Sequence, residues 1–374
     1  MSEKQPMRVL VTGAHGFIGK NFVVRLEEQT GTEALSFARG DSVEALVALV
    51  EQADAVVHLA GENRPVDVAD FALVNTDLTR TLCECIRATR RNIPLILASS
   101  TQAEQDNPYG QSKRAAEQVV EAFVNETGNR AVIYRLPGVF GKWCKPNYNS
   151  VVATFCHNIA RDVPIQVNDV SATVQLVYVD DVADGFLQVL DEAQSGLVWK
   201  KIDPIYTITL GELAEQIEAF QNCRTNLISE RVGTGLTRAL YSTYISYLPP
   251  EHFAYDLPMY GDERGIFVEM LKTPDCGQFS FFTVHPGITR GSHYHHTKTE
   301  KFLVLSGVAR MCFRQLVTGE TYEVTISGKK PQVIDTIPGC VHDITNVGDC
   351  DVVVMLWANE VFDRQKPDCI PCEV

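Results

Sequence analysis

The chain has 374 residues, of which 45% are hydrophobic and 21% charged, as in ordinary globular proteins. Its formal net charge of −14 argues against nucleic acid or an anionic membrane as a general partner. We find no apolar run of the roughly 20 residues that a membrane helix needs, and no signal-peptide core. Eleven scattered cysteines without a secretory signal indicate reduced thiols, so we expect a cytoplasmic protein that does not insert into a membrane.

The N-terminal region begins with a β-rich run at residues 8–12, followed by a glycine-rich turn and an amphipathic segment at 22–26. Strand, glycine-rich turn and helix in this order are the setting of a dinucleotide phosphate-binding loop. Glycines let the backbone approach a pyrophosphate, which binds at the positive helix N-terminus. We therefore predict that the loop contacts a cofactor through Gly13, His15, Gly16, Phe17, Ile18 and Gly19.

The next two strands add to this predicted cofactor site. Strand 34–38 ends at Arg39, where an NAD site places an acid for the ribose 2′-hydroxyl. An arginine there suits a 2′-phosphate, so we predict NADP(H), with an ordinary surface arginine as the alternative. The strand at 55–61 ends in Leu59, Ala60 and Gly61, and its small C-terminal residues allow close approach to the same ligand. For His58, which precedes them, the alternative is a histidine packed in the core.

The segment from Ser99 to Lys113 follows an apolar run at 94–98 and combines hydroxyls with a tyrosine and a lysine. If a helix begins at Tyr109, Lys113 lies four residues on and shares its face. A neighbouring ammonium lowers the pKa of a phenol, so the tyrosine can exchange a proton with a carbonyl or alcohol oxygen. A serine or threonine of this segment can hydrogen-bond the same oxygen.

Strands and helices alternate as far as the strand at 131–136, which indicates a Rossmann-type, doubly wound parallel sheet. The ordered motifs resemble the extended short-chain dehydrogenase/reductase family of nucleotide-sugar enzymes. These motifs are Gly13-x-x-Gly16-x-x-Gly19, His58-Leu-Ala-Gly61, Ser99-Ser-Thr101, Tyr109-x-x-x-Lys113, Arg135-Leu-Pro-Gly-Val-Phe-Gly141 and Tyr178-Val-Asp-Asp-Val182. The resemblance implies that Tyr109 is the acid/base and that Lys113 holds the cofactor ribose. It also implies that Thr101 or Ser100 binds the substrate oxygen.

A polar, aromatic loop follows at residues 141–149, and it suits the diphosphate and base of a nucleotide sugar. A solvated loop without a ligand is an equally good reading of each residue taken singly. The candidate substrate-binding residues are Arg135, Lys142, Trp143, Asn147 and Asn149. Further on, Thr209 and Glu212 form a capping box, which predicts a helix over 208–220.

The pattern changes after Pro249-Pro250, where short strand-length runs separated by Gly, Pro and Asp indicate an antiparallel barrel or sandwich. We expect a reductase domain over residues 1–247 and an all-β domain over 248–374. The all-β part holds Gly287-x5-His293-x-His295-x4-Glu300-x6-Gly307 and, later, Gly339-x2-His342. Alternate residues on a strand share a side, so His293 and His295 can point together into a barrel.

With Glu300 and His342 these histidines make a three-nitrogen, one-oxygen set suited to Zn²⁺ or another divalent transition metal. The spacings resemble the two motifs of the cupin fold, which implies a cupin barrel. The stretch Gly287-Ile-Thr-Arg-Gly-Ser-His-Tyr294 also looks like a segment of the sugar-nucleotide 3,5-epimerases. That likeness aligns Lys301 with a lysine that steadies an enolate, and a surface lysine is the alternative.

Over its full length the chain resembles a family of bifunctional capsular-polysaccharide enzymes. The resemblance implies conversion of a UDP-2-acetamido-2,6-dideoxy-4-keto-hexose to UDP-N-acetyl-6-deoxy-talosamine, toward UDP-N-acetyl-L-fucosamine, in a homodimer. The cupin would epimerise C3, and the N-terminal site would then reduce C4 with NADPH. Two alternatives remain open: a reductase with a structural or dimerising cupin, and an NADP(H)-sensing protein without turnover.

Overall fold

The computed structural model describes residues 5–65, 67–190, 192, 195–262, 265–268, 271, 277–360 and 365–374. The chain divides into two compact units, Met1–Ser150 with Val174–Thr207, and Val151–Thr173 with Ile208–Val374. Among the described residues, no helix has the length and apolarity required to cross a membrane.

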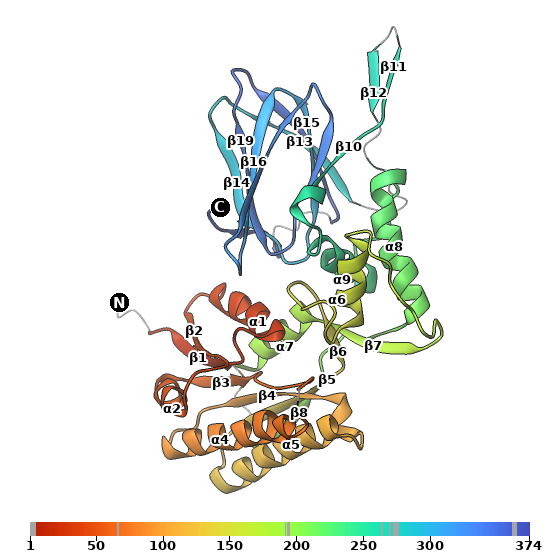
Figure 1. The fold of residues 1–374 in the computed structure, drawn as a ribbon. Helices are drawn as coiled ribbons and strands as arrows, with labels where there is room; N and C mark the ends of the chain where they lie inside the picture. Colours follow the sequence, from red (N-terminus) through yellow and green to blue (C-terminus); the bar gives the residue numbers. More distant parts are fainter. Residues whose placement is uncertain are drawn as a thin grey trace. The chain divides into compact units, whose positions relative to one another are not determined.

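The first unit is built on a six-stranded parallel sheet in the order β2-β1-β3-β4-β5-β8 (Figure 1). Its strands are β1 (Met7–Thr12), β2 (Thr32–Phe37), β3 (Ala55–His58), β4 (Leu95–Ser100), β5 (Ala131–Leu136) and β8 (Leu197–Lys200). The helices are α1 (Phe17–Glu27), α2 (Val43–Gln52), α3 (Ala69–Phe71), α4 (Leu78–Ala88), α5 (Pro108–Thr127) and α7 (Val179–Leu190). A π-helical turn, η1 (Ala72–Asp77), precedes α4, and a 3₁₀ turn, η2 (Thr101–Glu104), follows β4.

Each face of the parallel sheet has its own hydrophobic core, as alternation along a strand requires. Val9 and Val57 point to the face where Phe22 of α1 and Phe186 of α7 pack. Leu10, Val56 and Leu95 are among the sheet residues that face α2, α4 and α5. Helices therefore cover both faces, and the predicted doubly wound sheet is confirmed.

The order of this sheet reverses between β1 and β3, because the chain runs from β1 to β2 on one side and returns to β3 on the other. In open α/β sheets, ligands bind outside the carboxyl ends of the strands at such a switch point. The loops after β1 and β3 are therefore the place to look for a cofactor site.

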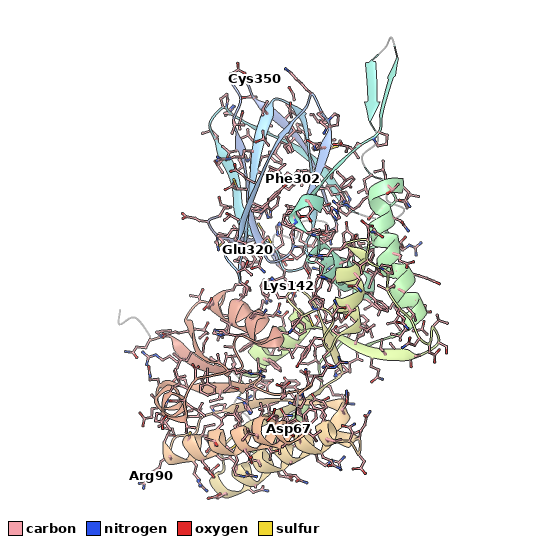
Figure 2. The ribbon with its side chains drawn as sticks, in the orientation of Figure 1. Asp67, Arg90, Lys142, Phe302, Glu320 and Cys350 are labelled. Carbon is pink, nitrogen blue, oxygen red and sulfur yellow. The ribbon has the colours of Figure 1, made fainter. Side chains whose placement is uncertain are left out.

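The second unit contains two antiparallel five-stranded sheets, β10-β18-β15-β20-β13 and β17-β16-β19-β14-β21. Their strands are β10 (Ala254–Asp256), β13 (Gln278–Val284), β14 (Thr289–Tyr294), β15 (Glu300–Ser306), β16 (Val308–Gln315), β17 (Thr321–Ser327), β18 (Gln332–Asp335), β19 (Cys340–Asn346), β20 (Val352–Ala358) and β21 (Ile370–Pro371). Phe302 of β15, labelled in Figure 2, packs 6.3 Å from the ring of His342 on β19, so side chains of the two sheets meet.

The remaining elements are three helices, a hairpin, a small sheet and a 3₁₀ turn. They are α6 (Val151–Ile159), α8 (Leu210–Asn226), α9 (Gly235–Ile245), the hairpin β11 (Met259–Asp262) with β12 (Gly265–Val268), the sheet of β6 (Gly138–Phe140), β7 (Thr173–Tyr178) and β9 (Tyr206–Thr209), and η3 (Pro250–His252). The predicted capping box at α8 is present, and the helix continues to Asn226. By contacts, α6, α8 and α9 group with the antiparallel sheets, whereas the expected domain boundary near residue 248 stays a prediction.

Candidate active site and metal centre

The glycine-rich loop leaves β1 at Gly13, whose φ of +69° lies in the left-handed region. A Cβ at Gly13 would stand 2.7 Å from the backbone nitrogen of Ala60, so only glycine fits between the ends of β1 and β3. Gly16 then caps α1 at its N-terminus. The structure thus places the predicted loop at the switch point, with the α1 N-terminus available to an anion.

His58 is a structural residue at this edge. Its Nδ1 lies 2.6 Å from Thr12 Oγ1, and its Nε2 lies 2.9 Å from Thr79 Oγ1. Burial lowers the pKa of His58 to about 3, with the Lys113 charge acting in the same direction, so the ring is neutral. It therefore links β1, β3 and α4, which agrees with the packed-histidine reading.

Tyr109 and Lys113 lie in the first turns of α5, which Asn107 caps by accepting a 2.8 Å hydrogen bond from the Gly110 N–H. The Tyr109 ring packs on Phe71 at 5.7 Å, and burial raises its pKa, while a hydrogen bond with Ser100 acts the other way. Lys113 Nζ donates to the Ala98 carbonyl at 3.0 Å. The helix therefore presents the phenol and the ammonium at the carboxyl end of β4.

The two candidate hydroxyls differ in position. Ser100 is the last residue of β4 and bonds to Tyr109, whereas Thr101 is exposed at the start of η2. The geometry therefore favours Ser100 as the hydroxyl that shares an oxygen ligand with Tyr109.

Burial lowers the pKa of Lys113 to about 8, and the carboxylate of Glu117 opposes that shift. A Cβ on Gly61 would lie 3.4 Å from Lys113 Nζ, so the loop after β3 runs directly beside the ammonium. The tyrosine–lysine pair and the glycine-rich loop therefore belong to one site.

Glu117 is a buried acid that the sequence did not identify as part of the site. It accepts hydrogen bonds from Ser99 Oγ at 2.5 Å and from Arg135 Nε and NH2 at 2.9 and 2.7 Å. The remaining guanidinium nitrogen of Arg135 pairs with Glu104 at 2.7 Å. Arg135, predicted to bind substrate, thus ties β5 to α5, and Glu117 also holds the end of β4 through Ser99. The spacing from Lys113 to Glu117, one helical turn, was the available signal.

Asn75 is a second buried polar residue that the sequence did not identify as part of the site. Its side-chain amide donates to Ser112 Oγ and to the Glu62 carbonyl, both at 2.9 Å, and its Oδ1 accepts from the Glu62 N–H at 2.8 Å. It sits on η1, so a single asparagine within a helical pattern gave no signal in the sequence.

Lys142, predicted to bind substrate and otherwise expected in a solvated loop, is buried. Its Nζ lies 2.6 Å from Asp180 Oδ1, and its side chain is 1% exposed. The partner acid belongs to the first turn of α7, 38 residues later, so the local sequence gave no sign of it. The prediction that Lys142 binds substrate is therefore corrected: it anchors the loop. Trp143 is half-buried, and Asn147 and Asn149 are exposed.

Arg39 lies just beyond β2 with its side chain 83% exposed, in an ion pair of 2.7 Å with Glu62. The Glu62 carboxylate also accepts a hydrogen bond from Tyr148 at 3.1 Å. The exposed Arg39 guanidinium lies beside the switch point and can bind a ligand if it gives up its ion pair with Glu62. A surface ion pair contributes little to stability, so this exchange is easy.

The four predicted metal ligands come together in the second unit. One ligand atom each from His293, His295, Glu300 and His342 lies within 4.8 Å of the others. Glu300 Oε2 stands 3.3 Å from His295 Nε2 and 3.6 Å from His342 Nε2. The last distance is too long for a hydrogen bond, and the buried His342 Nε2 has no hydrogen-bond partner among the described residues.

The donor set fits a divalent metal. Burial and the neighbouring histidines lower the pKa of His293 to about 4, so its imidazole is neutral, as a ligand must be. Beside this cluster lies a cavity of about 320 Å³, lined among others by Arg290, Phe281, Phe302 and Met311. A small polar ligand can therefore reach the cluster from an otherwise apolar pocket.

Lys301 is not in that pocket. It follows Glu300 on β15, so its side chain points to the opposite face of the sheet. There it is 2% exposed and pairs with Asp335 at 2.6 Å. The prediction that Lys301 is catalytic and the alternative of a surface lysine are therefore both wrong. Its ammonium instead forms a buried ion pair with Asp335.

The chain matches two families, "NAD dependent epimerase/dehydratase family" over residues 9–202 and "Polysaccharide biosynthesis C-terminal domain" over 260–370. A Pseudomonas aeruginosa protein, UDP-2-acetamido-2,6-beta-L-arabino-hexul-4-ose reductase, is 56% identical over 98% of this chain and 99% of its own length. The capsular polysaccharide assembling protein CapF from Staphylococcus aureus is 40% identical, with a TM-score of 0.66 over 98% of this chain and 100% of that one.

A UDP-glucuronic acid 4-epimerase from Bacillus cereus, 19% identical with a TM-score of 0.53, covers 58% of this chain and 84% of its own. It shares the fold of the first unit's family. As the motifs predicted, the chain belongs to the NAD dependent epimerase/dehydratase family and, over its full length, to the family that contains the Pseudomonas reductase and CapF.

Proposed function

We propose that this protein reduces the C4 ketone of a UDP-2-acetamido-2,6-dideoxy-hexulose with NADPH, after inverting the neighbouring C3. The observation that carries the proposal is the placement of Tyr109, Ser100 and Lys113 beside the glycine-rich loop at the switch point. The name of the 56% identical relative, a hexul-4-ose reductase, supports the substrate class. The product is then UDP-N-acetyl-6-deoxy-talosamine, a precursor for a capsular polysaccharide.

The cofactor would lie with its pyrophosphate at the N-terminus of α1 and its reactive ring near Tyr109. When bound, the nicotinamide supplies the hydride that reduces C4. Lys113, beside Gly61, would hold the ribose hydroxyls, and Arg39 would exchange Glu62 for the 2′-phosphate. An arginine at this position is the basis for preferring NADPH to NADH.

Proton delivery falls to the side chains at the end of β4. Burial raises the pKa of Tyr109, so the phenol is protonated at neutral pH and can give its proton to the new alkoxide. Ser100 donates a hydrogen bond to the same oxygen, and the Lys113 ammonium stabilises the phenolate that remains. Behind them, Glu117 holds the end of β4 through Ser99 and is itself held by Arg135.

The second unit would carry out the epimerisation in a cupin-type pocket. A ketone at C4 acidifies the C3 proton, so removal and return of that proton on opposite faces inverts C3 through an enolate. His293, His295, Glu300 and His342 would hold Zn²⁺ or a similar ion, whose chemistry is to polarise a carbonyl oxygen. Reduction removes the ketone, so epimerisation must come first.

The test is product analysis by NMR after the 4-keto sugar is incubated in D₂O with NADPH, with NADH, and without either. We expect the talosamine product with NADPH, little with NADH, and deuterium at C3 without any nicotinamide. Reduction without C3 exchange would leave a reductase with a structural metal unit, and binding of NADPH without oxidation would indicate a sensor. Light scattering on the same sample checks the expected homodimer.

A further inference from the structure

The C-terminal residues form a strand beside the metal centre. β21 pairs with β14 so that Pro371 lies opposite His293 and Ile370 opposite Tyr294. The Cys372 N–H donates to the Ser292 carbonyl at 2.9 Å. The strand that carries one predicted ligand, His293, is therefore flanked by the last residues of the chain.

Asp368, just before β21, binds the turn that joins β14 to β15. Its carboxylate accepts three consecutive main-chain N–H groups, from His296 at 2.9 Å and from Thr297 and Lys298 at 2.7 Å each. The Thr297 hydroxyl adds a fourth hydrogen bond at 3.1 Å. A carboxylate that accepts several N–H groups is a strong, directional anchor.

The turn that Asp368 binds lies between His295 and Glu300, two of the predicted metal ligands. Contacts made at this turn orient both side chains. The main-chain carbonyl of Asp368 accepts a hydrogen bond from His295 Nδ1, which leaves Nε2 facing Glu300 at 3.3 Å. Lys298 Nζ lies 2.6 Å from Glu300 Oε1, which leaves Oε2 facing the histidines. Each ligand thus presents one defined atom to the centre.

We propose that residues 365–374 are part of the metal centre and that Asp368 is its positioning residue. Its carboxylate holds this segment against the turn, so that its main-chain carbonyl fixes His295 and Lys298 fixes Glu300. The inference rests on the metal site proposed above. Outer partners of metal ligands set their tautomer and orientation, and their loss typically lowers metal affinity by roughly 10–100-fold. Asp368 lies 73 residues from His295, so the support for this histidine comes from a distant part of the sequence.

The test compares Asp368→Ala and Asp368→Asn with the wild type and with Asp349→Asn, an exposed acid of the same unit. Competition for Zn²⁺ with a chromogenic chelator of known affinity gives the Kd of each protein, and the visible spectrum of the Co²⁺-loaded protein reports ligand geometry. We expect Asp368→Ala to bind zinc about 10–100-fold more weakly with an altered Co²⁺ spectrum, and Asp368→Asn to fall between.

Thermal unfolding of the metal-free proteins separates positioning from simple stability. A positioning role predicts that the Ala and Asn variants lose affinity even at temperatures well below their metal-free midpoints. Zinc affinity within about twofold of wild type, with an unchanged Co²⁺ spectrum, overturns the role of Asp368 while leaving the metal site intact. Absence of zinc binding by the wild type overturns both the metal site and this inference.

Discussion

The two sites of this chain are built in opposite ways. The reductase site lies at the carboxyl edge of a parallel sheet, and its principal residues lie in the loops after β1 and β3, at the end of β4 and in the first turns of α5. The predicted metal centre lies between two antiparallel sheets. Its candidate ligands lie on β14, just after β14, on β15 and on β19, with a support from residues 365–374. A site at a sheet edge is encoded in local motifs, whereas a site between sheets depends on partners far apart in sequence.

The largest effect should separate the two sites outright. Tyr109→Phe removes the proton donor, so we expect NADPH oxidation with the 4-keto sugar to fall by about 10²–10⁴-fold. Deuterium exchange at C3 should keep its wild-type rate, because the second unit does not use this residue. Glu121→Gln, an exposed change on the same helix, is the control for α5. Equal losses in both reactions would show that the two activities share one site.

The reciprocal change is His295→Ala. Loss of a ligand should cost more zinc affinity than the roughly 10–100-fold assigned to outer partners, and C3 exchange should fall with it. NADPH binding, measured by fluorescence titration, should be unaffected. His285→Ala, which removes a histidine that is 77% exposed in the same unit, is the matched control. Normal C3 exchange in a zinc-free His295→Ala protein would assign the metal a structural role.

The comparison also explains which residues could be predicted. Gly13, Tyr109 and Lys113 belong to short motifs, Gly13-x-x-Gly16-x-x-Gly19 and Tyr109-x-x-x-Lys113, so the sequence alone could single them out as candidates. Lys142 was misread because its partner Asp180 is separated from it by a helix and a strand, and burial of a lysine depends on such a partner. Nothing in a short polar tail containing Asp368 identifies it as an anchor for His295.

The prediction of a catalytic role for Lys301 was wrong for a different reason, because the sequence itself argues against it. The alternation that places His293 and His295 on one side places Glu300 and Lys301 on opposite sides. Applied to β15 as it was to β14, the same rule excludes Lys301 from the pocket. Adjacent residues on a strand should therefore not be assigned to one site without a bulge between them.

The smallest expected effect is a pH dependence that belongs to one site alone. Burial lowers the pKa of Lys113 to about 8, so its ammonium form, which stabilises the Tyr109 phenolate, is lost as the pH rises through that value. At pH 9 about one tenth of the lysine remains charged, so kcat for reduction should fall about tenfold between pH 7 and pH 9. C3 exchange has no link to Lys113 and should not show this decline. A reduction rate that stays flat to pH 9.5 would mean that the Lys113 charge does not limit proton transfer from Tyr109.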